Sequence, residues 1–308
     1  MAVVDERRPS ALVLLGATAS GKTALGIEVA QRLGGEIISA DSRAIFAGLE
    51  IVTDRPSTEE RRGVLHHLIG TVPFHESYDA MAFRRDVKRL VAEIDRRGHI
   101  PLIVGGSTLY LEAILRGVFE GPSKDPAFRS SLDGEAAATL HRRLEAIDPA
   151  AAQSIHPNDR LRITRALEVY ELTGRPISAW QREIEPLPIR FDVYGLARDR
   201  VEHRKAIAAR VVRMLDRGLI EEVSHLREAG LTPGMQAYRT IGIPEVFDHL
   251  DGRATREEVE QAMVRHTWAL ARRQAAWFRR YKQIRWIDAE GAKRQDIASE
   301  VIEGWRRP

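Results

Sequence analysis

Short apolar runs alternate with amphipathic segments along the first third of the chain. The runs ALVLL (residues 11–15), EIISAD (36–41) and IPLIVGG (100–106) have the length and composition of buried strands. Apolar residues recur at helical spacing in ALGIEVAQRL, after the first run, and in residues 79–98, before the third. Strands that alternate with amphipathic helices predict an α/β core with a parallel sheet.

The pattern changes between Gly121 and Pro188. Strand-like runs disappear there, and helical patterns follow one another in LHRRLEAI and DRLRITRALEVYELTG. Strand-like alternation returns in RFDVYGLA, residues 190–197. We therefore expect a core formed by residues 1–120 and 189–308, interrupted by a helical insertion at 121–188. Near the end of the core, AYRTIGIP is expected to be a loop and IASEVIEGWRRP a helix.

A glycine-rich segment, GATASGKT, separates the first predicted strand from its helix and fits the phosphate-loop spacing G-x-x-x-x-G-K-[ST]. Glycines at both ends let the backbone turn tightly, so that successive N–H groups and the helix N-terminus surround a phosphate group. Lys22 adds a positive charge, and Thr23 offers a hydroxyl to Mg²⁺. We predict a phosphate or diphosphate site made of Gly16, Ala17, Thr18, Ala19, Ser20, Gly21, Lys22 and Thr23.

Two further strand ends are expected at the same edge of the sheet, because ligands of open α/β sheets bind at the carboxyl ends of the strands. The second strand delivers Asp41, which could bind Mg²⁺ through water, act as a general base, or cap the next turn. The third strand ends in Gly-Gly-Ser107 and lacks the metal carboxylate of a hydrolytic P-loop ATPase. A phosphate cradle, a carboxylate and a hydroxyl together favour group transfer from a phosphorylated donor over hydrolysis.

The net charge of +3 and the pI of 9.3 slightly favour polyanionic binding partners. Residues 261–287 contain no Asp or Glu, and their arginines alternate with aromatic residues. Such a stretch can neutralise phosphates and stack bases, although the tryptophans, Trp277 above all, equally suit a core-facing stripe. The arginines of the insertion fit either a solvated helix face or a nucleic-acid contact.

The absence of cysteine excludes disulfides, thiolate catalysis and thiolate zinc sites. No apolar run reaches the roughly 18–20 residues needed to cross a bilayer, and the N-terminus lacks the apolar region of a signal peptide. We therefore expect a cytoplasmic protein with no membrane partner, and a monomer.

An ordered series of stretches resembles the tRNA dimethylallyltransferases, also called tRNA isopentenyltransferases, of the IPP transferase family. The stretches are GATASGKT, ADS, PLIVGGSTLYLEAIL, IHPNDRLRITRALEVYELTGRPIS, MLDRGLIEEV and LARRQAAWFRR, and they cover nearly the whole length of a somewhat divergent member. The resemblance implies a P-loop NTPase-like parallel sheet with an inserted helical domain, Mg²⁺ dependence, and dimethylallyl diphosphate as donor. The implied acceptor is the tRNA anticodon stem-loop, at the N6 amine of the adenosine 3′ to the anticodon.

The resemblance also implies roles for individual residues. Asp41 would take the proton from the N6 amine, Ser107, where the family usually has threonine, would hydrogen-bond near the reacting centre, and Arg210 would bind the diphosphate. The implied tRNA contacts are Asp41, Ser42, Arg43, Ala44, Ser107, Arg129, Leu161, Arg162, Ile163, Thr164, Arg165, Arg239, Thr240, Gly242, Arg272, Arg273, Gln274, Trp277 and Arg279.

Departures from the family pattern leave the acceptor less certain than the donor. Phe46 stands where tyrosine is usual, Val52 where glycine is usual, Ile243-Pro244 where Tyr-Lys is usual, and Trp268 where arginine is usual. The GGS triplet also looks like that of the related plant adenylate prenyltransferases. Three alternatives stay open: free AMP or ADP as acceptor, a P-loop small-molecule kinase that uses ATP, and a non-catalytic RNA-binding protein whose loop only anchors an anion.

Overall fold

The computed structural model describes residues 8–289 and 291–306. Its strands are β1 (Ser10–Gly16), β2 (Gly35–Ala40), β3 (His66–His67), β4 (Ile100–Gly105), β5 (Arg190–Ala197) and β6 (Arg285–Asp288). Its helices are α1 (Lys22–Leu33), α2 (Thr58–Arg61), α3 (Ala80–Arg96), α4 (Thr108–Leu115), α5 (Pro126–Ser131), α6 (Ala137–Ile147), α7 (Pro149–Ser154), α8 (Arg160–Thr173), α9 (Ile177–Arg182), α10 (Arg200–Asp216), α11 (Leu219–Glu228), the 3-10 helix η1 (Ala237–Arg239), α12 (Ile243–Leu250), α13 (Arg256–Phe278) and α14 (Arg294–Arg306). Among these residues no helix combines the length and the apolar character that crossing a membrane requires.

The chain separates into two compact units. Unit 1 consists of residues 1–111 and 188–308, and unit 2 of residues 112–187. Unit 2 starts earlier than residue 121, because the second half of α4 groups with the helices that follow it and not with the sheet. The expected limits of a separate insertion domain, 121 and 188, stay a prediction.

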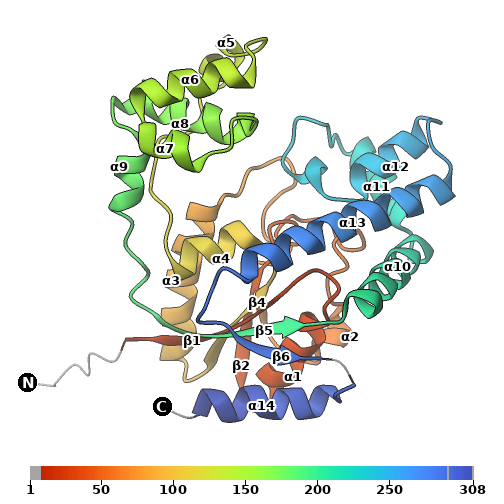
Figure 1. Ribbon diagram of the computed structural model, residues 1–308. Coiled ribbons are helices and arrows are strands. Elements are labelled where there is room, and N and C mark those ends of the chain that lie inside the picture. The colour runs from red at the N-terminus through yellow and green to blue at the C-terminus, as the bar shows by residue number, and fades with distance from the viewer. Residues whose placement is uncertain (1–7, 290, 307–308) are drawn as a thin grey trace, which may run out of the picture. The chain divides into compact units, whose positions relative to one another are not determined.

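A six-stranded sheet in the order β3-β2-β4-β1-β5-β6 forms the centre of unit 1 (Figure 1). Every neighbouring pair is parallel; β1, for example, pairs Leu12 with Leu102 of β4 and Val13 with Val193 of β5. The side chains of Ala11–Leu15 are 0% exposed, as the continuous apolar run predicts for a strand covered on both faces. The predicted P-loop-like α/β core with a parallel sheet is thereby confirmed. The predicted strands correspond to β1, β2 and β4 and, for residues 190–197, to β5.

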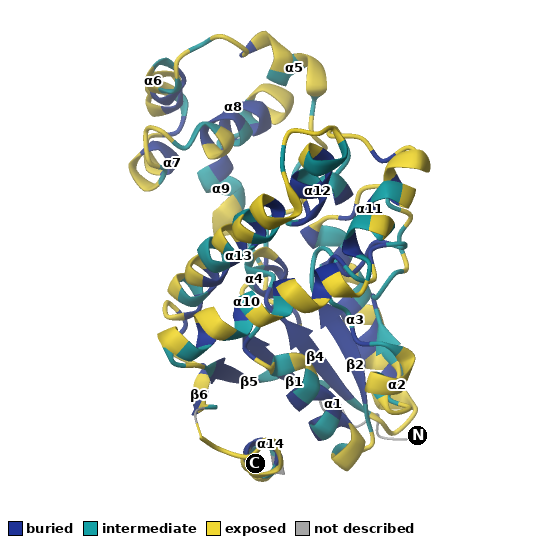
Figure 2. Ribbon diagram, turned by 90° about the vertical axis from the view of Figure 1, so that its right-hand side faces the viewer, coloured by how far each residue is buried: buried dark blue, intermediate teal, exposed yellow. Residues whose placement is uncertain are grey.

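Helices cover both faces of this sheet because the strand order reverses after β3. Right-handed crossovers place α1, which leads from β1 to β2, opposite α3, which leads from β3 to β4. α1 packs with α14 over one face, where Leu12, Leu14 and Leu196 share a buried cluster with both helices. α3 and α13 also contact the sheet (Figure 2). The arrangement leaves the carboxyl ends of β1, β2 and β4 side by side.

Two segments of unit 1 differ from expectation. AYRTIGIP is not wholly a loop, since η1 forms within it and α12 begins at Ile243. The start of α12 is favoured because Pro244 occupies the first turn and the Glu245 carboxylate accepts the Gly242 N–H at 2.7 Å. The edge strand β6 was not predicted, because RWID is too short and too polar to stand out as a strand.

Unit 2 is a small helical bundle with its own apolar core, which includes Leu140, Leu144 and Ile163. A fully buried carboxylate, Glu168, lies inside it and is paired with Arg129 at 2.6 Å and Arg165 at 2.7 Å. Burial alone would raise the pKa of Glu168, but the hydrogen bonds from the two arginines outweigh it and hold the pKa at about 2. Helical packing in this region agrees with the sequence pattern.

Candidate active site

The segment between β1 and α1 has the backbone of a phosphate cradle. Ala19 and Gly21 adopt left-handed conformations, with φ of 61° and 94°, and Gly21 caps α1. A Cβ on Gly16 would lie 2.7 Å from the Ser20 hydroxyl, so only glycine fits there without a shift. The GATASGKT segment is thus curled so that the N-terminus of α1 points to the edge of the sheet, as the motif predicts.

Lys22 points back over the cradle, and its ammonium donates to the Ala17 carbonyl at 3.2 Å. Burial lowers the pKa of Lys22 to about 8; nearby Asp41 opposes this shift and nearby Arg210 adds to it. An anion bound in the cradle would favour the charged ammonium. Binding of a phosphate would therefore raise the pKa of Lys22.

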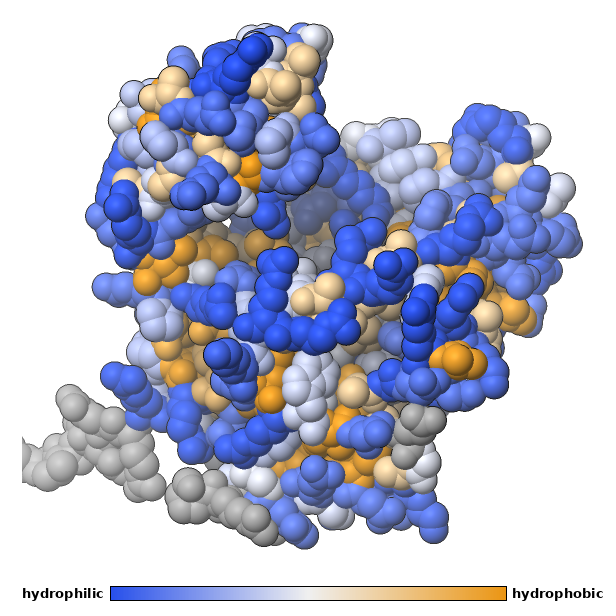
Figure 3. Space-filling model, viewed as in Figure 1, coloured by the Kyte–Doolittle hydropathy of each residue, from blue (hydrophilic) through white to orange (hydrophobic). Residues whose placement is uncertain are grey.

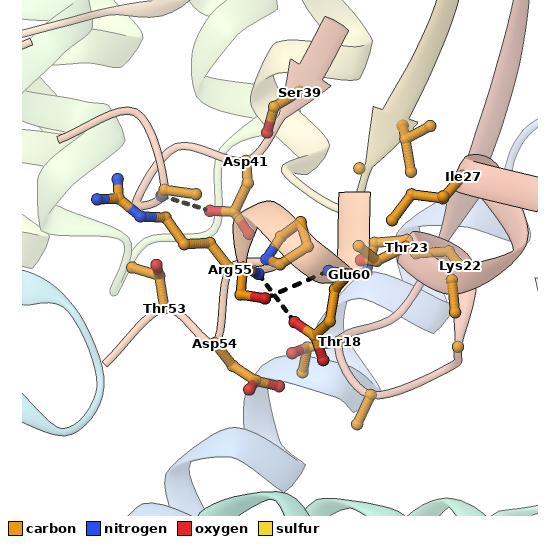
Figure 4. A pocket seen from close by; sticks show the side chains of 18 of the residues that line it. Thr18, Lys22, Thr23, Ile27, Ser39, Asp41, Thr53, Asp54, Arg55 and Glu60 are labelled. Carbon is orange, nitrogen blue, oxygen red and sulfur yellow. Dashed lines mark hydrogen bonds between the residues drawn. The ribbon is translucent and has the colours of Figure 1, made fainter. Parts of the chain in front are cut away.

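A cavity of about 1100 Å³ opens in front of the cradle, and all of its lining lies in unit 1. Figure 4 shows Ser39 and Asp41, at the end of β2, on one side and Lys22 and Thr23, at the start of α1, on the other. Thr18 lines the same cavity. The structure thus brings the expected phosphate loop and the expected base to one site.

Asp41 has the capping role that was weighed from the sequence, and its carboxylate also lines the cavity. Its Oδ1 accepts the N–H groups of Arg43 at 2.8 Å and Ala44 at 3.2 Å, so it caps the turn after β2. The same carboxylate lines the cavity, close enough to Lys22 to raise the pKa of that amine. Capping fixes the orientation of the carboxylate while Oδ2 stays available to a ligand.

Arg210, on α10, lies against the phosphate loop. Its guanidinium donates to the Thr18 hydroxyl and, at 2.9 Å, to the Thr53 carbonyl. Its Nε lies 3.0 Å from the carboxylate of Asp54. From the residues alone, Arg210 was a candidate for the anionic site that could equally be a solvated helix arginine, and the family resemblance favoured the anion. Sequence reasoning missed Asp54, which lies in a polar, turn-rich segment with no motif of its own.

Ser107 lies beside the cavity but is not part of its lining. Its N–H donates to the Ala40 carbonyl at 3.1 Å, and its own carbonyl accepts the Leu111 N–H in the first turn of α4. Ser107 is therefore adjacent to the strand end that carries Asp41. Its hydroxyl role stays a prediction.

Two side chains from distant helices hold the phosphate loop in place, and sequence reasoning identified neither in that role. Gln274 of α13 accepts the Thr18 N–H at 2.9 Å and donates to the Gly106 carbonyl at 2.7 Å, which joins the loops after β1 and β4. His203 of α10 lies 2.7 Å from the Thr18 carbonyl through Nε2, and burial lowers its pKa. The ring of Trp268 meets His203 edge to face.

Some of the expected tRNA contacts, which all stay predictions, lie at buried positions. Ala44, Ile163, Thr164, Thr240, Gly242 and Gln274 are all buried, so a side chain at these positions does not reach the surface. Ile163 belongs to the core of unit 2, and the Thr240 hydroxyl donates to the Ala237 carbonyl. Helical periodicity explains the burial of Ile163 and Thr164 on α8 and of Gln274 on α13, because every third or fourth residue of a helix faces inward.

The remaining expected contacts are at least partly accessible. Arg272 and Arg273 on α13 and Arg279, which caps its C-terminus, are exposed, and Figure 3 shows strongly hydrophilic side chains gathered across this helix. Trp277 is half-buried and packs on Tyr281 with ring centroids 4.2 Å apart, as the core-facing reading expects. The exposed or partly exposed positions are Ser42, Arg43, Ser107, Arg129, Leu161, Arg162, Arg165 and Arg239. Arg129 and Arg165 are already committed to Glu168.

The donor set of the cavity suits a hard cation that arrives with a phosphate. The Thr23 hydroxyl and the Asp41 carboxylate line the same cavity, and Mg²⁺ is usually held by one or two carboxylates, substrate phosphates and water. Over the described part of the chain, no group of three or more His, Cys, Asp or Glu residues is placed to hold a metal. Any Mg²⁺ here would rely on the phosphate oxygens.

Comparisons with known proteins agree with this geometry. Residues 44–281 match the family described as IPP transferase. The chain is 41% identical over 303 residues to a tRNA dimethylallyltransferase of Pelotomaculum thermopropionicum, covering 96% of each, and 42% identical over 297 residues to one of Thermotoga maritima, covering 94% of this chain and 97% of that one.

Solved structures give the same result. A tRNA isopentenylpyrophosphate transferase of Staphylococcus epidermidis superposes with a TM-score of 0.72 at 32% identity, covering 97% of this chain and 99% of that one. A eukaryotic dimethylallyltransferase described as acting on tRNA gives a TM-score of 0.82 at 26% identity, over 97% of this chain and 80% of that one. The chain belongs to the IPP transferase family, the prenyl-transferring enzymes to which these tRNA dimethylallyltransferases also belong.

Proposed function

We propose that this protein transfers the dimethylallyl group of dimethylallyl diphosphate to the N6 amine of the adenosine 3′ to the anticodon in tRNA. The observation that carries the proposal is that the phosphate loop, Arg210 and Asp41 line a single cavity. A diphosphate held by the first two would present its allylic carbon toward the third. The names of the relatives, all tRNA dimethylallyltransferases, support tRNA as the acceptor.

The reaction exchanges one bond for another. The allylic C–O bond breaks, the diphosphate leaves with the electron pair, and the N6 nitrogen forms a bond to the allylic carbon. The amine then loses a proton, which the Asp41 carboxylate accepts. The base must leave its stack to reach the cavity, as in other enzymes that act on a nucleobase.

Stabilisation of the leaving diphosphate is expected to raise the transfer rate more than general-base help from Asp41 does. Charge develops on the departing diphosphate oxygens, where Lys22, the N–H groups of the phosphate loop and Arg210 converge in a partly enclosed site. Removal of one such donor typically costs about 10²–10³-fold in rate. General-base help from Asp41 contributes about 10²–10⁴-fold. Mg²⁺, which Thr23 and the substrate phosphates would hold, supplies further charge neutralisation when bound.

The decisive experiment is a modification assay on the full chain. Unmodified tRNA with adenosine 3′ to the anticodon is incubated with dimethylallyl diphosphate and Mg²⁺, and nuclease fragments are weighed by mass spectrometry. One added prenyl group on that adenosine is expected. Transfer to no tRNA of this kind would contradict the proposal.

Two parallel reactions separate the alternatives. Free AMP and ADP replace tRNA in one, and ATP replaces the prenyl donor in the other. Faster prenylation of free nucleotide than of tRNA would make the chain an adenylate prenyltransferase. Phosphoryl transfer from ATP to a small molecule, with no use of the prenyl donor, would make it a kinase.

A further inference from the structure

The cavity lining contains three acidic residues besides Asp41, namely Asp54, Glu59 and Glu60, and Asp54 has no part in the proposed chemistry. Figure 4 shows it at the same end of the cavity as Thr18 of the phosphate loop. Its backbone is left-handed, with φ of 49°, a conformation that Asp and Asn adopt more readily than most other residues with a Cβ. The hydrogen bonds of the turn decide where this carboxylate lies.

The turn that carries Asp54 is held from three sides. The N–H groups of Ile51 and Val52 donate to the Glu222 carboxylate of α11 at 2.7 and 2.8 Å. The Asp54 N–H donates to the Ile51 carbonyl at 2.9 Å, and the Thr53 carbonyl accepts from Arg210. These hydrogen bonds hold the turn in one conformation and so fix the position of Asp54.

Asp54 bridges two arginines of the cavity. One carboxylate oxygen lies 3.0 Å from Nε of Arg210, and the other lies 3.2 Å from Nη1 of Arg217. The Arg210 side chain is only 17% exposed and that of Asp54 only 25%, so water screens this pair less than an ion pair on the open surface. One negative charge thus offsets positive charge at the position where a diphosphate would bind.

A diphosphate that contacts Arg210 would have the Asp54 carboxylate on the other side of the same guanidinium. Like charges a few ångströms apart in a partly buried site repel measurably. The carboxylate also orients Arg210, which favours binding. Repulsion is the larger effect, because the Thr18 and Thr53 hydrogen bonds already orient that side chain.

We propose that Asp54 is a positioning residue that holds Arg210 and Arg217 in place and weakens the grip of the cavity on diphosphate, so that the inorganic pyrophosphate product can leave. This inference rests on the proposed function, since it requires the cavity to bind a diphosphate. Without Asp54, the arginines and Lys22 would retain a polyanion more tightly. Transfer itself would proceed, and turnover would be limited by product release.

The test measures binding of inorganic pyrophosphate to the full chain by isothermal titration calorimetry, for the unchanged chain and for Asp54→Asn. Asparagine has the same shape and tolerates the left-handed backbone. We expect the dissociation constant of pyrophosphate to be about tenfold lower for Asp54→Asn, as for removal of one like charge in a partly screened site. The affinity for inorganic triphosphate should increase by a still larger factor. Asp54→Gly, which relieves the backbone as well, should act in the same direction.

Kinetics separates this role from a merely structural one. With prenyl donor and tRNA, Asp54→Asn should keep its single-turnover rate within about twofold and lose multiple-turnover rate, with a burst of one product per enzyme. Asp216→Asn is the matched control, because Asp216, at the end of α10, also pairs with an arginine, Arg256, and is not part of the cavity lining. It should change neither quantity.

Each other outcome overturns the inference. Unchanged or weaker pyrophosphate binding by Asp54→Asn would show that Asp54 only orients Arg210 or does nothing for the ligand, while the proposed function would stand. Failure of the unchanged chain to bind pyrophosphate would overturn the diphosphate site itself, and this inference with it.

Discussion

Asp41 occupies a position where one carboxylate oxygen maintains the fold and the other faces the cavity. Asp41→Asn separates the two roles, because the amide oxygen can still accept the N–H groups of Arg43 and Ala44. We expect the single-turnover transfer rate to fall by about 10²–10⁴-fold, with tRNA affinity and thermal unfolding unchanged. A variant that transfers at the normal rate would remove Asp41 as the base.

Lys22 gives the donor site a pH dependence. Its pKa is about 8 in the structure without ligand, and a bound diphosphate would raise it, so binding at pH 8 to 9 should be accompanied by proton uptake. Affinity for pyrophosphate should therefore fall as the pH rises through about 8. Calorimetry in buffers with different ionisation enthalpies measures the uptake directly. Lys22→Arg, which stays charged, should lose this dependence.

At the scale of residues, the sequence predicts what a local motif specifies. Gly16, Lys22 and Asp41 were identified because a phosphate loop and a strand end can be read from neighbouring residues. Asp54 and His203 were not, since their roles depend on contacts between segments far apart in the chain. Thr18 and His203, for example, are 185 positions apart, and no pattern in either segment signals their pairing.

At the scale of elements, α13 is the support of the phosphate loop as well as a basic surface. Gln274→Leu would leave the part-buried Thr18 N–H and the buried Gly106 carbonyl without their partner Gln274. A buried group without a partner typically costs about 1–3 kcal/mol, and the cost is smaller where water can reach the group. We expect lower stability in urea and weaker pyrophosphate binding. Arg273→Ala, next to it on the exposed face, should change neither. Equal effects of the two changes would refute the support role.

Elements that bury a continuous apolar face were the predictable ones. β1, β2 and β4 stand out because each is enclosed on both sides, and α3 because Phe83, Val87 and Ile94 recur on one face. The strand β6 and the helix α12 escaped prediction, since packing and a Glu245 cap, rather than composition, determine them. Whether such short segments form a strand or a helix depends on their tertiary contacts.

At the scale of the whole molecule, two buried carboxylates limit acid stability, one in each unit. Glu36, paired with Arg97, His67 and His99, and Glu168 both have a pKa of about 2. Both values are lowered from 4.5, so the stability they contribute is complete above pH 4.5 and is lost as the pH falls toward 2. Far-UV circular dichroism during acid titration should show loss of structure in that window.

Glu168→Gln tests the contribution of unit 2. It removes the charge that pairs with Arg129 and Arg165, and we expect a loss of about 3 kcal/mol at pH 7, the lower end of the range for broken buried pairs, because both arginines reach solvent. Urea unfolding at pH 7 measures it. The control is Glu183→Gln, whose exposed pair with Arg175 should matter little; a similar loss there would argue against the buried pair.

Binding of tRNA should depend steeply on salt. If Arg272, Arg273 and Arg279 contact phosphates, replacing each by alanine should weaken binding uniformly across tRNAs and reduce the slope of log affinity against log salt by about one. Filter binding at several salt concentrations gives the slope. Arg89→Ala on α3, whose arginine is paired with Asp86 and Glu93, should leave it unchanged. Unaltered slopes for all three variants would place the RNA elsewhere.

The packing of α14 on α1 has a consequence for the order of synthesis. Arg32, in the helix that follows the phosphate loop, donates to the Gln295 carbonyl and the Ser299 hydroxyl at 3.1 and 3.0 Å. The phosphate loop and α1 are synthesised long before α14, which packs on α1. Until α14 has been made, α1 therefore lacks part of its covering, and ribosome-stalled intermediates that end before α14 should bind pyrophosphate more weakly than those that include it.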